Sequence, residues 1–145
     1  MAGKLSGKAA LVTGASSGNG RAIARLFAEE GASVTVADIR NDPRMGGEPT
    51  HELITAAGGE AQYVECDVSS ASDLQAAVSA TVDTYGSLDI MVNNAGVERQ
   101  RPIEEVDEDD YDWLMDINLK GVYFGSQAAI QQMLDQDGGG VIINM

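Results

Sequence analysis

Short apolar segments alternate with helical patterns along the whole chain, and this alternation constrains the fold more than any other feature. Apolar segments of strand length cover residues 9–12, 33–37, 61–64, 90–92 and 141–144, and helical patterns lie near residues 19–30, 49–57, 72–85 and 108–135. Consecutive parallel strands need a long crossover connection, which is usually a helix. We therefore predict an α/β fold with a doubly wound parallel sheet, in one domain over residues 1–145 that ends after the fifth strand.

A glycine-rich turn follows the first predicted strand, where Leu11–Ile23 read LVTGASSGNGRAI. Gly14 can make the tight turn off the strand, Gly18 lets phosphate oxygens approach the backbone, and Gly20 lets the next helix pack close to the sheet. The N-terminus of that helix adds unpaired N–H groups and the positive end of a dipole. The turn predicts a Rossmann-type site for a pyrophosphate, although glycines also serve in ordinary turns and caps.

Polar residues stand at the ends of two other predicted strands. Asp38 ends the second strand, 18 residues after Gly20, and ribose-binding acids stand about 20 residues after such glycines. A carboxylate there can accept hydrogen bonds from both ribose hydroxyls and would repel a 2′-phosphate; the alternative is a solvated acid. Ile90–Gly96 (IMVNNAG) is a buried strand that ends in two asparagines, at the sheet edge where ligands of open α/β folds bind.

The chain is strongly acidic, and this excludes two classes of partner. It carries 23 acidic and 9 basic residues, a net charge of −14 and a pI near 4.1. Nucleic acids and anionic membranes both require a basic surface, so we expect neither as a partner. An excess of aspartate over glutamate and of arginine over lysine is typical of proteins adapted to high salt, where self-repulsion is screened. An ordinary acidic bacterial enzyme remains the alternative.

Cysteine and histidine are too scarce for a disulfide or a zinc site. Cys66 is the single cysteine, and His51 is the single histidine, so we expect no metal site. His51 lies in a polar stretch and is predicted to be an exposed helix residue. No run of 18 apolar residues occurs and the N-terminus lacks a signal-peptide pattern, which predicts a soluble, cytoplasmic protein.

The last predicted helix combines an apolar stripe with one polar residue. The stripe is expected to face the sheet and consists of Leu114, Ile117, Gly121, Val122, Gly125, Ala129 and Met133. Its two glycines predict close packing of helix on sheet. Asn118 lies on or beside the stripe, and a structural and a catalytic role both remain open. At the start of this helix Asp107 is predicted to be the cap, with acids in the first turn favoured by the helix dipole.

In this order and spacing, the motifs make the chain similar to the short-chain dehydrogenase/reductase family over its whole length. TGASSGNG matches the T-G-x-x-x-G-x-G of the family, Cys66-Asp67-Val68 matches its adenine-binding D-V step, and NNAG at 93–96 matches the motif after its fourth strand. Asn118, in DINLKG, falls on the family's catalytic asparagine.

The resemblance implies a Rossmann sheet with NAD(H) or NADP(H) as hydride carrier. The cofactor-binding residues that it implies are Gly14, Ser16, Ser17, Gly18, Asn19, Gly20, Asp38, Ile39, Asp67, Val68, Asn94, Ala95 and Gly96. Members that prefer NADP usually have a basic residue at the position of Ser17 or at the end of the second strand. Ser17 and Asp38 therefore favour NAD, although Arg40 is near.

The sequence departs from the family pattern in two ways. Asn19 replaces the usual aliphatic residue, and its side chain could cap the helix or touch the pyrophosphate. The family's serine and Y-x-x-x-K are missing, because none of the four tyrosines has a lysine four residues on and no serine follows Ser126. Of the family's four catalytic residues only Asn118 is present.

The resemblance implies an oxidoreductase that transfers hydride between NAD and a small alcohol or ketone, with the present chain as its N-terminal, cofactor-binding part. Without an acid/base this chain is expected not to turn over. A non-catalytic dinucleotide-binding module is the alternative, and NNAG and Asn118 disfavour a methyltransferase. The full-length form is expected to be a homo-oligomer, and Val141–Ile143 is expected to be an uncovered apolar edge strand.

Overall fold

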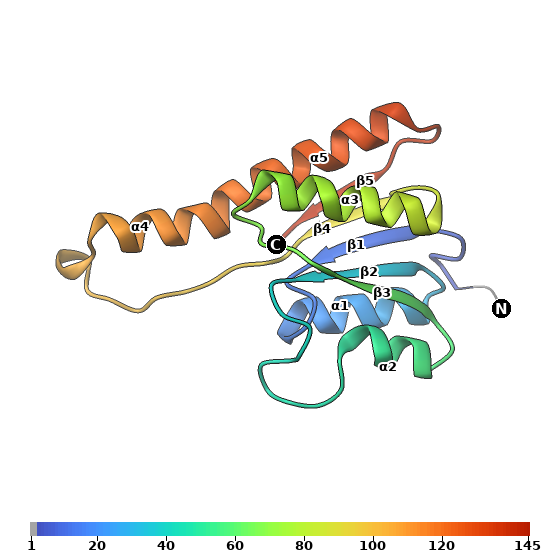
Figure 1. Ribbon diagram of the computed structural model, residues 1–145, viewed down its shortest axis with the longest axis horizontal. Helices are drawn as coiled ribbons and strands as arrows, with labels where there is room; N and C mark the ends of the chain where they lie inside the picture. The colour runs from blue at the N-terminus through green and yellow to red at the C-terminus, as the bar shows by residue number, and fades with distance from the viewer. Residues whose placement is uncertain (1–2) are drawn as a thin grey trace.

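The computed structural model describes residues 3–145 and contains one parallel sheet of five strands in the order β3-β2-β1-β4-β5 (Figure 1). The strands are β1 (Ala9–Thr13), β2 (Ser33–Asp38), β3 (Glu60–Glu65), β4 (Ile90–Asn93) and β5 (Val141–Asn144). From β1 the chain winds outward through β2 and β3, and it then returns to the other side of β1 for β4 and β5. This reversal confirms the predicted doubly wound α/β fold and leaves a crevice at the carboxyl ends of β1 and β4.

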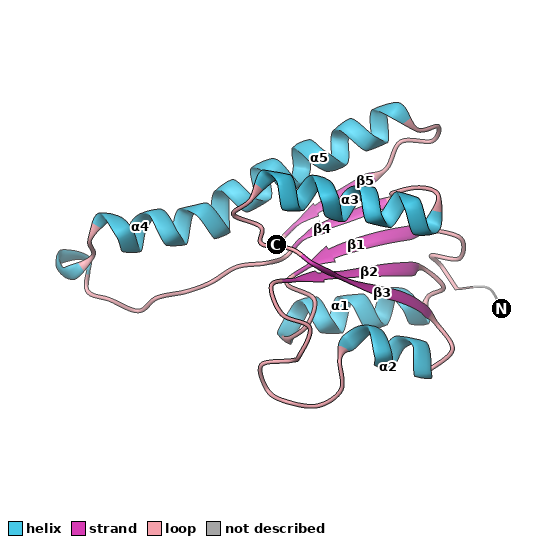
Figure 2. Ribbon diagram, viewed as in Figure 1, coloured by secondary structure: helices cyan, strands magenta, loops and turns pink. Residues whose placement is uncertain are grey.

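Helices cover both faces of the sheet (Figure 2). On one face lie α1 (Gly18–Glu29) and α2 (Thr50–Ala56), and on the other lie α3 (Ala71–Tyr85) and α5 (Gly121–Asp135). Buried side chains form one cluster on each face, so that Leu11 packs with α3 and α5 while its neighbour Val12 packs with α1 and α2. All five residues of β1 are buried, as expected for the central strand of a sheet covered on both sides.

The helix predicted over residues 108–135 is three consecutive segments. These are α4 (Glu108–Met115), a π-helical turn η2 (Asp116–Lys120) and α5. Before them, the chain after β4 forms a long loop with a short 3-10 turn, η1 (Ile103–Glu105). We call residues 97–115 the arm, because loop, η1 and α4 project beyond the carboxyl edge of the sheet (Figure 1). π-turns are rare and occur often at functional sites.

The predicted stripe is buried only where α5 covers the sheet. Its members Gly121, Gly125, Ala129 and Met133 are buried, whereas Leu114, Ile117 and Val122 are only partly buried. Leu114 lies on the arm, beyond the sheet, and the other two line cavities described below.

The two stripe glycines allow the close packing that was predicted for them. A Cβ on Gly121 would lie 2.9 Å from Cγ2 of Val68, and one on Gly125 would lie 2.2 Å from Oδ1 of Asn93. Any side chain at Gly125 would therefore push α5 away from β4.

Two further sequence predictions have different outcomes. Asp107 is the cap of α4, since its Oδ1 accepts a hydrogen bond of 2.8 Å from the backbone N of Asp110, as predicted. His51 lies in α2 as expected, but it is partly buried rather than exposed. Its ring centroid lies 6.1 Å from that of Tyr63 on β3, because α2 packs against that strand.

The last strand is the least covered part of the sheet. As predicted, β5 lies at the edge, and the side chains of Val141 and Ile143 are 56% and 37% exposed. Among residues 3–145, no helix is long and apolar enough to span a bilayer.

Candidate functional site

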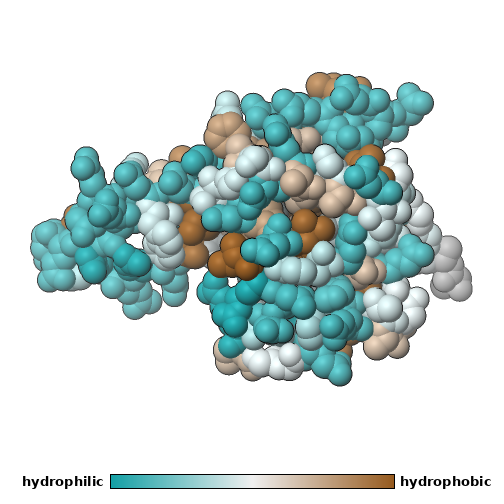
Figure 3. Space-filling model, viewed as in Figure 1, coloured by the Kyte–Doolittle hydropathy of each residue, from teal (hydrophilic) through white to brown (hydrophobic). Residues whose placement is uncertain are grey.

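A cavity of about 630 Å³ lies at the carboxyl edge of the sheet, in the crevice that the strand order creates. Figure 3 shows hydrophobic side chains gathered where the arm meets the body of the molecule. The lining comes from the glycine turn, the ends of β2, β3 and β4, and the arm with η2: Gly14, Ser17, Gly18, Asn19, Asp38, Ile39, Arg44, Met45, Cys66, Asp67, Val68, Ser69, Asn94, Ala95, Gly96, Val97, Trp113, Asp116 and Ile117. All but two of the predicted cofactor residues are in this lining.

Each of the three motif glycines has a conformation or a close approach that favours glycine. Gly14 and Gly18 have φ angles of +64° and +56°, in the left-handed region that glycine adopts without strain. A Cβ on Gly20 would lie 2.2 Å from the carbonyl oxygen of Gly14, so only glycine lets α1 begin this close to the turn. A Cβ on Gly18 would meet no atom within 4 Å and would point into open space. The turn is thus a backbone cradle that fits a phosphate group at the N-terminus of α1.

Thr13 and Asn94 tie the glycine turn to the end of β4. Oγ1 of Thr13 accepts hydrogen bonds from the backbone N atoms of Asn94 and Ala95, at 2.9 and 3.0 Å. In return Nδ2 of Asn94 donates to the carbonyl oxygen of Thr13 at 3.0 Å. Thr13 was quoted in the sequence motif but was not predicted as a site residue. These bonds fix the two loops that flank the cavity relative to each other.

Ser16 and Gly20 are the two predicted cofactor residues that do not line the cavity, and their contact with the phosphates stays a prediction. Ser16 is buried because its Oγ donates a 2.6 Å hydrogen bond to the carbonyl oxygen of Arg40. Its backbone N donates to Oδ2 of Asp38 at 3.0 Å. Asp38 therefore has one oxygen fixed on the turn, and its carboxylate forms part of the cavity wall at the end of β2.

The wall beyond β3 is made by Cys66, Asp67 and Val68. Oδ1 of Asp67 accepts hydrogen bonds from N and Oγ of Ser69, at 2.9 and 2.7 Å, which closes the turn into α3. Burial raises the pKa of the Cys66 thiol to about 12, and nearby carboxylates, first that of Asp73, add to the shift. The thiol is therefore neutral at physiological pH, and this wall is apolar at its base and acidic at its rim.

Asn118 clamps the π-turn to the loop after β4. Its Oδ1 accepts a 2.8 Å hydrogen bond from the backbone N of Val97, and its Nδ2 donates a 2.8 Å hydrogen bond to the carbonyl oxygen of Val97. Asn118 is exposed rather than buried on the stripe, because it lies in η2 outside the sheet. It lines a second cavity, of about 650 Å³, together with Gly96 and Val97.

Asn93, the first asparagine of NNAG, has a structural position. It is buried, and its Nδ2 donates to Oγ of Ser126 at 3.1 Å and to Oδ1 of Asn144 at 2.9 Å. These bonds join β4 to α5 and to β5. The two neighbouring asparagines of the motif therefore serve different parts of the fold.

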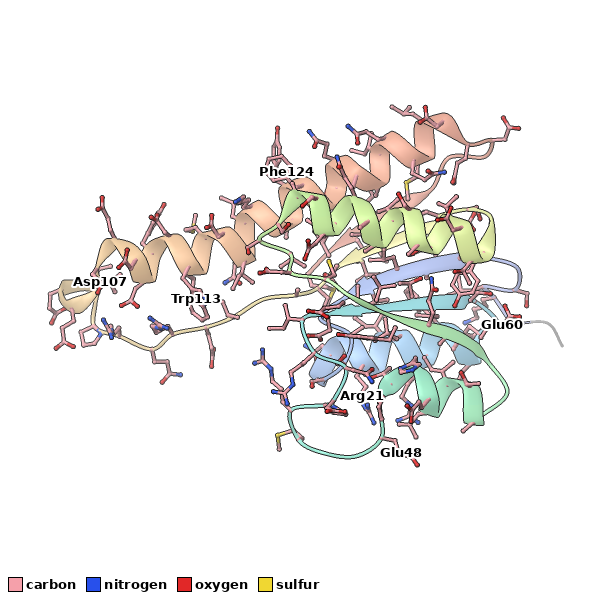
Figure 4. The ribbon with its side chains drawn as sticks, in the orientation of Figure 1. Arg21, Glu48, Glu60, Asp107, Trp113 and Phe124 are labelled. Carbon is pink, nitrogen blue, oxygen red and sulfur yellow. The ribbon has the colours of Figure 1, made fainter. Side chains whose placement is uncertain are left out.

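The arm adds the aromatic residue Trp113, which sequence reasoning missed. Trp113 points from α4 toward the loop after β4 (Figure 4) and lines both cavities. The guanidinium carbon of Arg99 lies 4.6 Å from the ring centroid of Trp113. Arg99 and Arg101 both pair with the largely buried carboxylate of Asp110. No pattern in the sequence distinguishes these residues from an ordinary charged helix face.

Comparisons with known proteins agree on one family. The family model described as short chain dehydrogenase matches residues 8–145. An uncharacterized oxidoreductase of Thermotoga maritima is 47% identical over 139 residues, which are 96% of this chain and 53% of the relative. A D-threitol dehydrogenase of Mycolicibacterium smegmatis is 41% identical over 98% of this chain and 53% of its own length.

The fold comparison gives the same family. The crystal structure of a short chain dehydrogenase from Mycobacterium smegmatis superposes with a TM-score of 0.90 at 36% identity, and it covers 98% of this chain and 59% of that protein. The chain thus spans about half the length of the curated relatives that it matches.

Proposed function

The chain belongs to the short-chain dehydrogenase family, and from this we propose that it is the cofactor-binding part of an NAD-preferring oxidoreductase acting on small alcohols or ketones. The nicotinamide ring of such a cofactor carries the hydride in this chemistry. Residues 3–145 bind and orient the cofactor, and the observation that carries the proposal is the backbone cradle at Gly14, Gly18 and Gly20.

The phosphate end is formed by the turn and the first residues of α1. Ser17 is the N-cap position of α1, and its side chain does not cap the helix, which leaves the first N–H groups of Gly18 and Asn19 available. They lie at the positive end of the helix dipole, which favours an anion. Asn19 lines the cavity and is exposed, so contact with the pyrophosphate is the role we assign to it.

The preference for NAD rests on Asp38. One carboxylate oxygen of Asp38 is fixed by the backbone N of Ser16, while the other makes only a long contact, 3.4 Å, with the backbone N of Arg40. A ribose hydroxyl can donate to that second oxygen, whereas a 2′-phosphate would be repelled. The side chain of Arg40 lines neither cavity and donates through Nε to the carbonyl oxygen of Asp42. It therefore offers no counter-charge to a 2′-phosphate.

The residues that line the cavities also suggest where the adenine and the nicotinamide of the cofactor would lie. Asp67 and Val68 line the side next to Ile39, which suits the adenosine part. Asn94, Ala95 and Gly96 line both cavities, and they continue toward Asn118. We assign the nicotinamide and the reacting carbon of the substrate to this second side. The D-threitol dehydrogenase among the relatives is named for an alcohol substrate, and this supports the substrate class.

Among the described residues, the cavities lack a tyrosine that could act as the acid/base. None of the four tyrosines lines either cavity. The hydroxyl of Tyr63 donates to the carbonyl oxygen of Asp38, and that of Tyr85 donates to the carbonyl oxygen of Val34. Burial raises the pKa of both, that of Tyr85 to about 12, whereas an acid/base must titrate near the working pH. We infer that the 145-residue chain binds the dinucleotide but does not turn over.

Calorimetric titration of the chain with NADH, NADPH and S-adenosylmethionine tests the proposal. We expect NADH to bind tightest, NADPH weaker and S-adenosylmethionine not at all. The variant Gly18→Ala is expected to weaken NADH binding about tenfold or more, because its methyl group enters the cradle. Gly7→Ala is the matched control, since Gly7 also has a positive φ and open surroundings but lines neither cavity. Equal loss of affinity in both variants, or binding of S-adenosylmethionine alone, would contradict the assignment.

A further inference from the structure

The loop between β2 and α2 is fastened to the glycine turn and to α1 at its two ends and at Arg44 in its middle. Oγ of Ser16 donates to the carbonyl oxygen of Arg40 at the start of the loop, and Oγ of Thr50 at its end donates to the carbonyl oxygen of Ala15, at 2.6 and 2.9 Å. From α1, Nη1 of Arg21 donates to the backbone carbonyl oxygen of Glu48 at 2.8 Å, and the two residues are labelled in Figure 4. The loop is therefore a built part of the site, with a defined position.

The middle of the loop presents Arg44 to the cavities. The backbone N of Arg44 donates a 2.7 Å hydrogen bond to Oγ of Ser17, the residue just before α1. The chain then turns back through Gly46 and Gly47, whose φ angles of +78° and +97° allow this reversal. The side chain of Arg44 is exposed and lines both cavities. The hydrogen bond to Ser17 thus fixes the backbone of Arg44, from which the side chain extends to the cavities.

Arg44 is also the only basic side chain, among residues 3–145, that lines either cavity. The other charged residues in the two linings are acidic, namely Asp38, Asp67, Glu98 and Asp116. The whole chain has a net charge of −14, so all other charged side chains in this site repel an anionic ligand.

We propose that the guanidinium of Arg44 binds the pyrophosphate of the dinucleotide and supplies the cationic contact that this acidic cleft otherwise lacks. The proposal rests on the dinucleotide-binding function proposed above. Arginine is suited to this role because its planar fork can donate two charge-assisted hydrogen bonds to phosphate oxygens. The cradle N–H groups and Arg44 then hold the pyrophosphate from two sides.

The position of Arg44 distinguishes the pyrophosphate from the 2′ position of the ribose. Arg44 and Asn19, in the first turn of α1, line both cavities, and so do residues 94–97 and Trp113. All of these residues lie where the cavities join, and among them Arg44 and Asn19 come from the loop after β2 and from the N-terminus of α1. Asp38, which marks the ribose, lines only the first cavity, and Asn118 lines only the second. The pyrophosphate is the part of the ligand that connects those two ends.

Calorimetry with Arg44→Gln, using NADH, ADP-ribose and adenosine as probes, tests this assignment. We expect NADH and ADP-ribose to bind about tenfold weaker or more, because a charge-assisted contact is lost, while adenosine is unaffected. Inorganic pyrophosphate is expected to compete with NADH for the wild type at high concentration and less well for the variant. Molar KCl should reduce the difference between wild type and variant, because salt screens exposed charges.

Two further variants complete the experiment. Arg40→Gln is the matched control, because Arg40 lies on the same loop and is also exposed but lines neither cavity, and we expect no change in its affinity for NADH. Arg44→Lys keeps the charge and should bind NADH with intermediate affinity. All three variants should melt like the wild type, since the side chains are exposed.

Three results would overturn the assignment of Arg44. The first is an unchanged affinity of Arg44→Gln for NADH and ADP-ribose. The second is a loss of affinity confined to NADPH, which would mean that Arg44 binds the 2′-phosphate of the ribose rather than the pyrophosphate. The third is an equal loss in Arg40→Gln, which would show a general effect of charge. If the wild type bound no nicotinamide dinucleotide, the proposed function would fail first and this assignment with it.

Discussion

The glycine turn and the arm both border the candidate site, but different interactions hold them in place. The turn at residues 13–20 is fixed by backbone hydrogen bonds, by Thr13 and Asn94, and by the close approach of Gly20 to Gly14. Within the arm, charged side chains join the loop to α4, since Arg99 and Arg101, whose side chains are 44% and 41% exposed, both pair with Asp110. At its base, the side chain of Asn118 in η2 bonds the backbone of Val97. Partly exposed ion pairs contribute little to stability.

This difference indicates which side of the cleft is rigid. The turn joins fully buried β1 to α1, so it should open only when the domain unfolds. The arm lies beyond the sheet, and its 3-10 turn η1 has no buried residue. Segments with few buried contacts open at low free energy. We therefore expect the phosphate end of the site to be preformed and the end next to Trp113 to adjust when a ligand binds.

Gly20→Ala should have the largest effect on stability and on NADH binding, because the substitution lies in the glycine turn, the rigid side of the cleft. The new methyl group would overlap the carbonyl oxygen of Gly14, which is backbone and cannot rotate away. We expect the free energy of unfolding to fall by about 2–3 kcal/mol and NADH binding to be lost, as measured by denaturant titration and calorimetry. Gly121→Ala is the matched helical glycine; its methyl group would meet a side chain, that of Val68, and the loss of stability should be smaller. Equal stability of Gly20→Ala and wild type would disprove the close packing.

Alkaline pH is expected to have the second-largest effect. It should lower the stability of the body, which we define as the sheet with the helices that cover it, rather than that of the arm. Burial raises the pKa of the Cys66 thiol from 9.0 to about 12, and that of the Tyr85 hydroxyl from 10.0 to about 12. The unfolded chain releases these protons at lower pH than the folded chain does. The stability that they contribute is thus complete below about pH 9 and is lost as the pH rises to about 12.

The melting temperature is accordingly expected to be insensitive to these groups below pH 9 and to fall between pH 9 and 12. In Cys66→Ala the fall should be shallower from pH 9 upward, and in Tyr85→Phe it should be shallower only above pH 10. Both side chains belong to the body, so Trp113 on the arm should report the change only when the whole domain unfolds. A Cys66→Ala profile as steep as that of the wild type would contradict the argument.

The same difference explains how much the sequence could predict. All five strands were predicted to within two residues at each end. The central strands β1, β2 and β4 are largely buried, and strands buried on both faces are continuous apolar runs. The glycine turn was predicted because its geometry depends on residues that are neighbours in the sequence. The long-range hydrogen bond from Oγ of Ser16 to the carbonyl oxygen of Arg40 is a contact that spacing cannot reveal.

The parts that were missed depend on contacts between distant residues. The π-turn at Asp116–Lys120 lies within a continuous helical pattern, and helical propensity does not distinguish a π-turn from an α-helix. No motif marks the loop at residues 41–50, so the contribution of Arg44 to the site went unnoticed. Trp113 lies at the site through contacts within the arm, where Arg99 and Asp110 join the loop to α4. The predicted adaptation to high salt stays a prediction, which melting curves in KCl can test.

Asp110→Asn should affect the arm while leaving the body nearly unchanged. The carboxylate of Asp110 is the common partner of two arginines, and its loss should loosen the contact between the loop and α4 within the arm. Trp113 is the single tryptophan, so its fluorescence is expected to shift to the red and to become more accessible to acrylamide. The free energy of unfolding should fall by only about 1 kcal/mol. Asp109→Asn is the matched control, since Asp109 is an exposed neighbour in the same first turn. A large loss of stability in Asp110→Asn would mean that the arm is part of the rigid core.

Asn19→Ile should have the smallest effect, although it lies at the heart of the glycine motif. Ser17, not Asn19, is the N-cap position of α1, so Asn19 does not cap the helix as the sequence allowed. Its side chain is exposed and lines both cavities. We expect the free energy of unfolding to change by less than about 0.5 kcal/mol and the affinity for NADH to fall by less than about threefold, because backbone N–H groups rather than this amide supply the main contacts. A tenfold loss would mean that the side chain of Asn19 binds the pyrophosphate as strongly as the cradle does, and the rigid side of the cleft would then depend on a side chain as well.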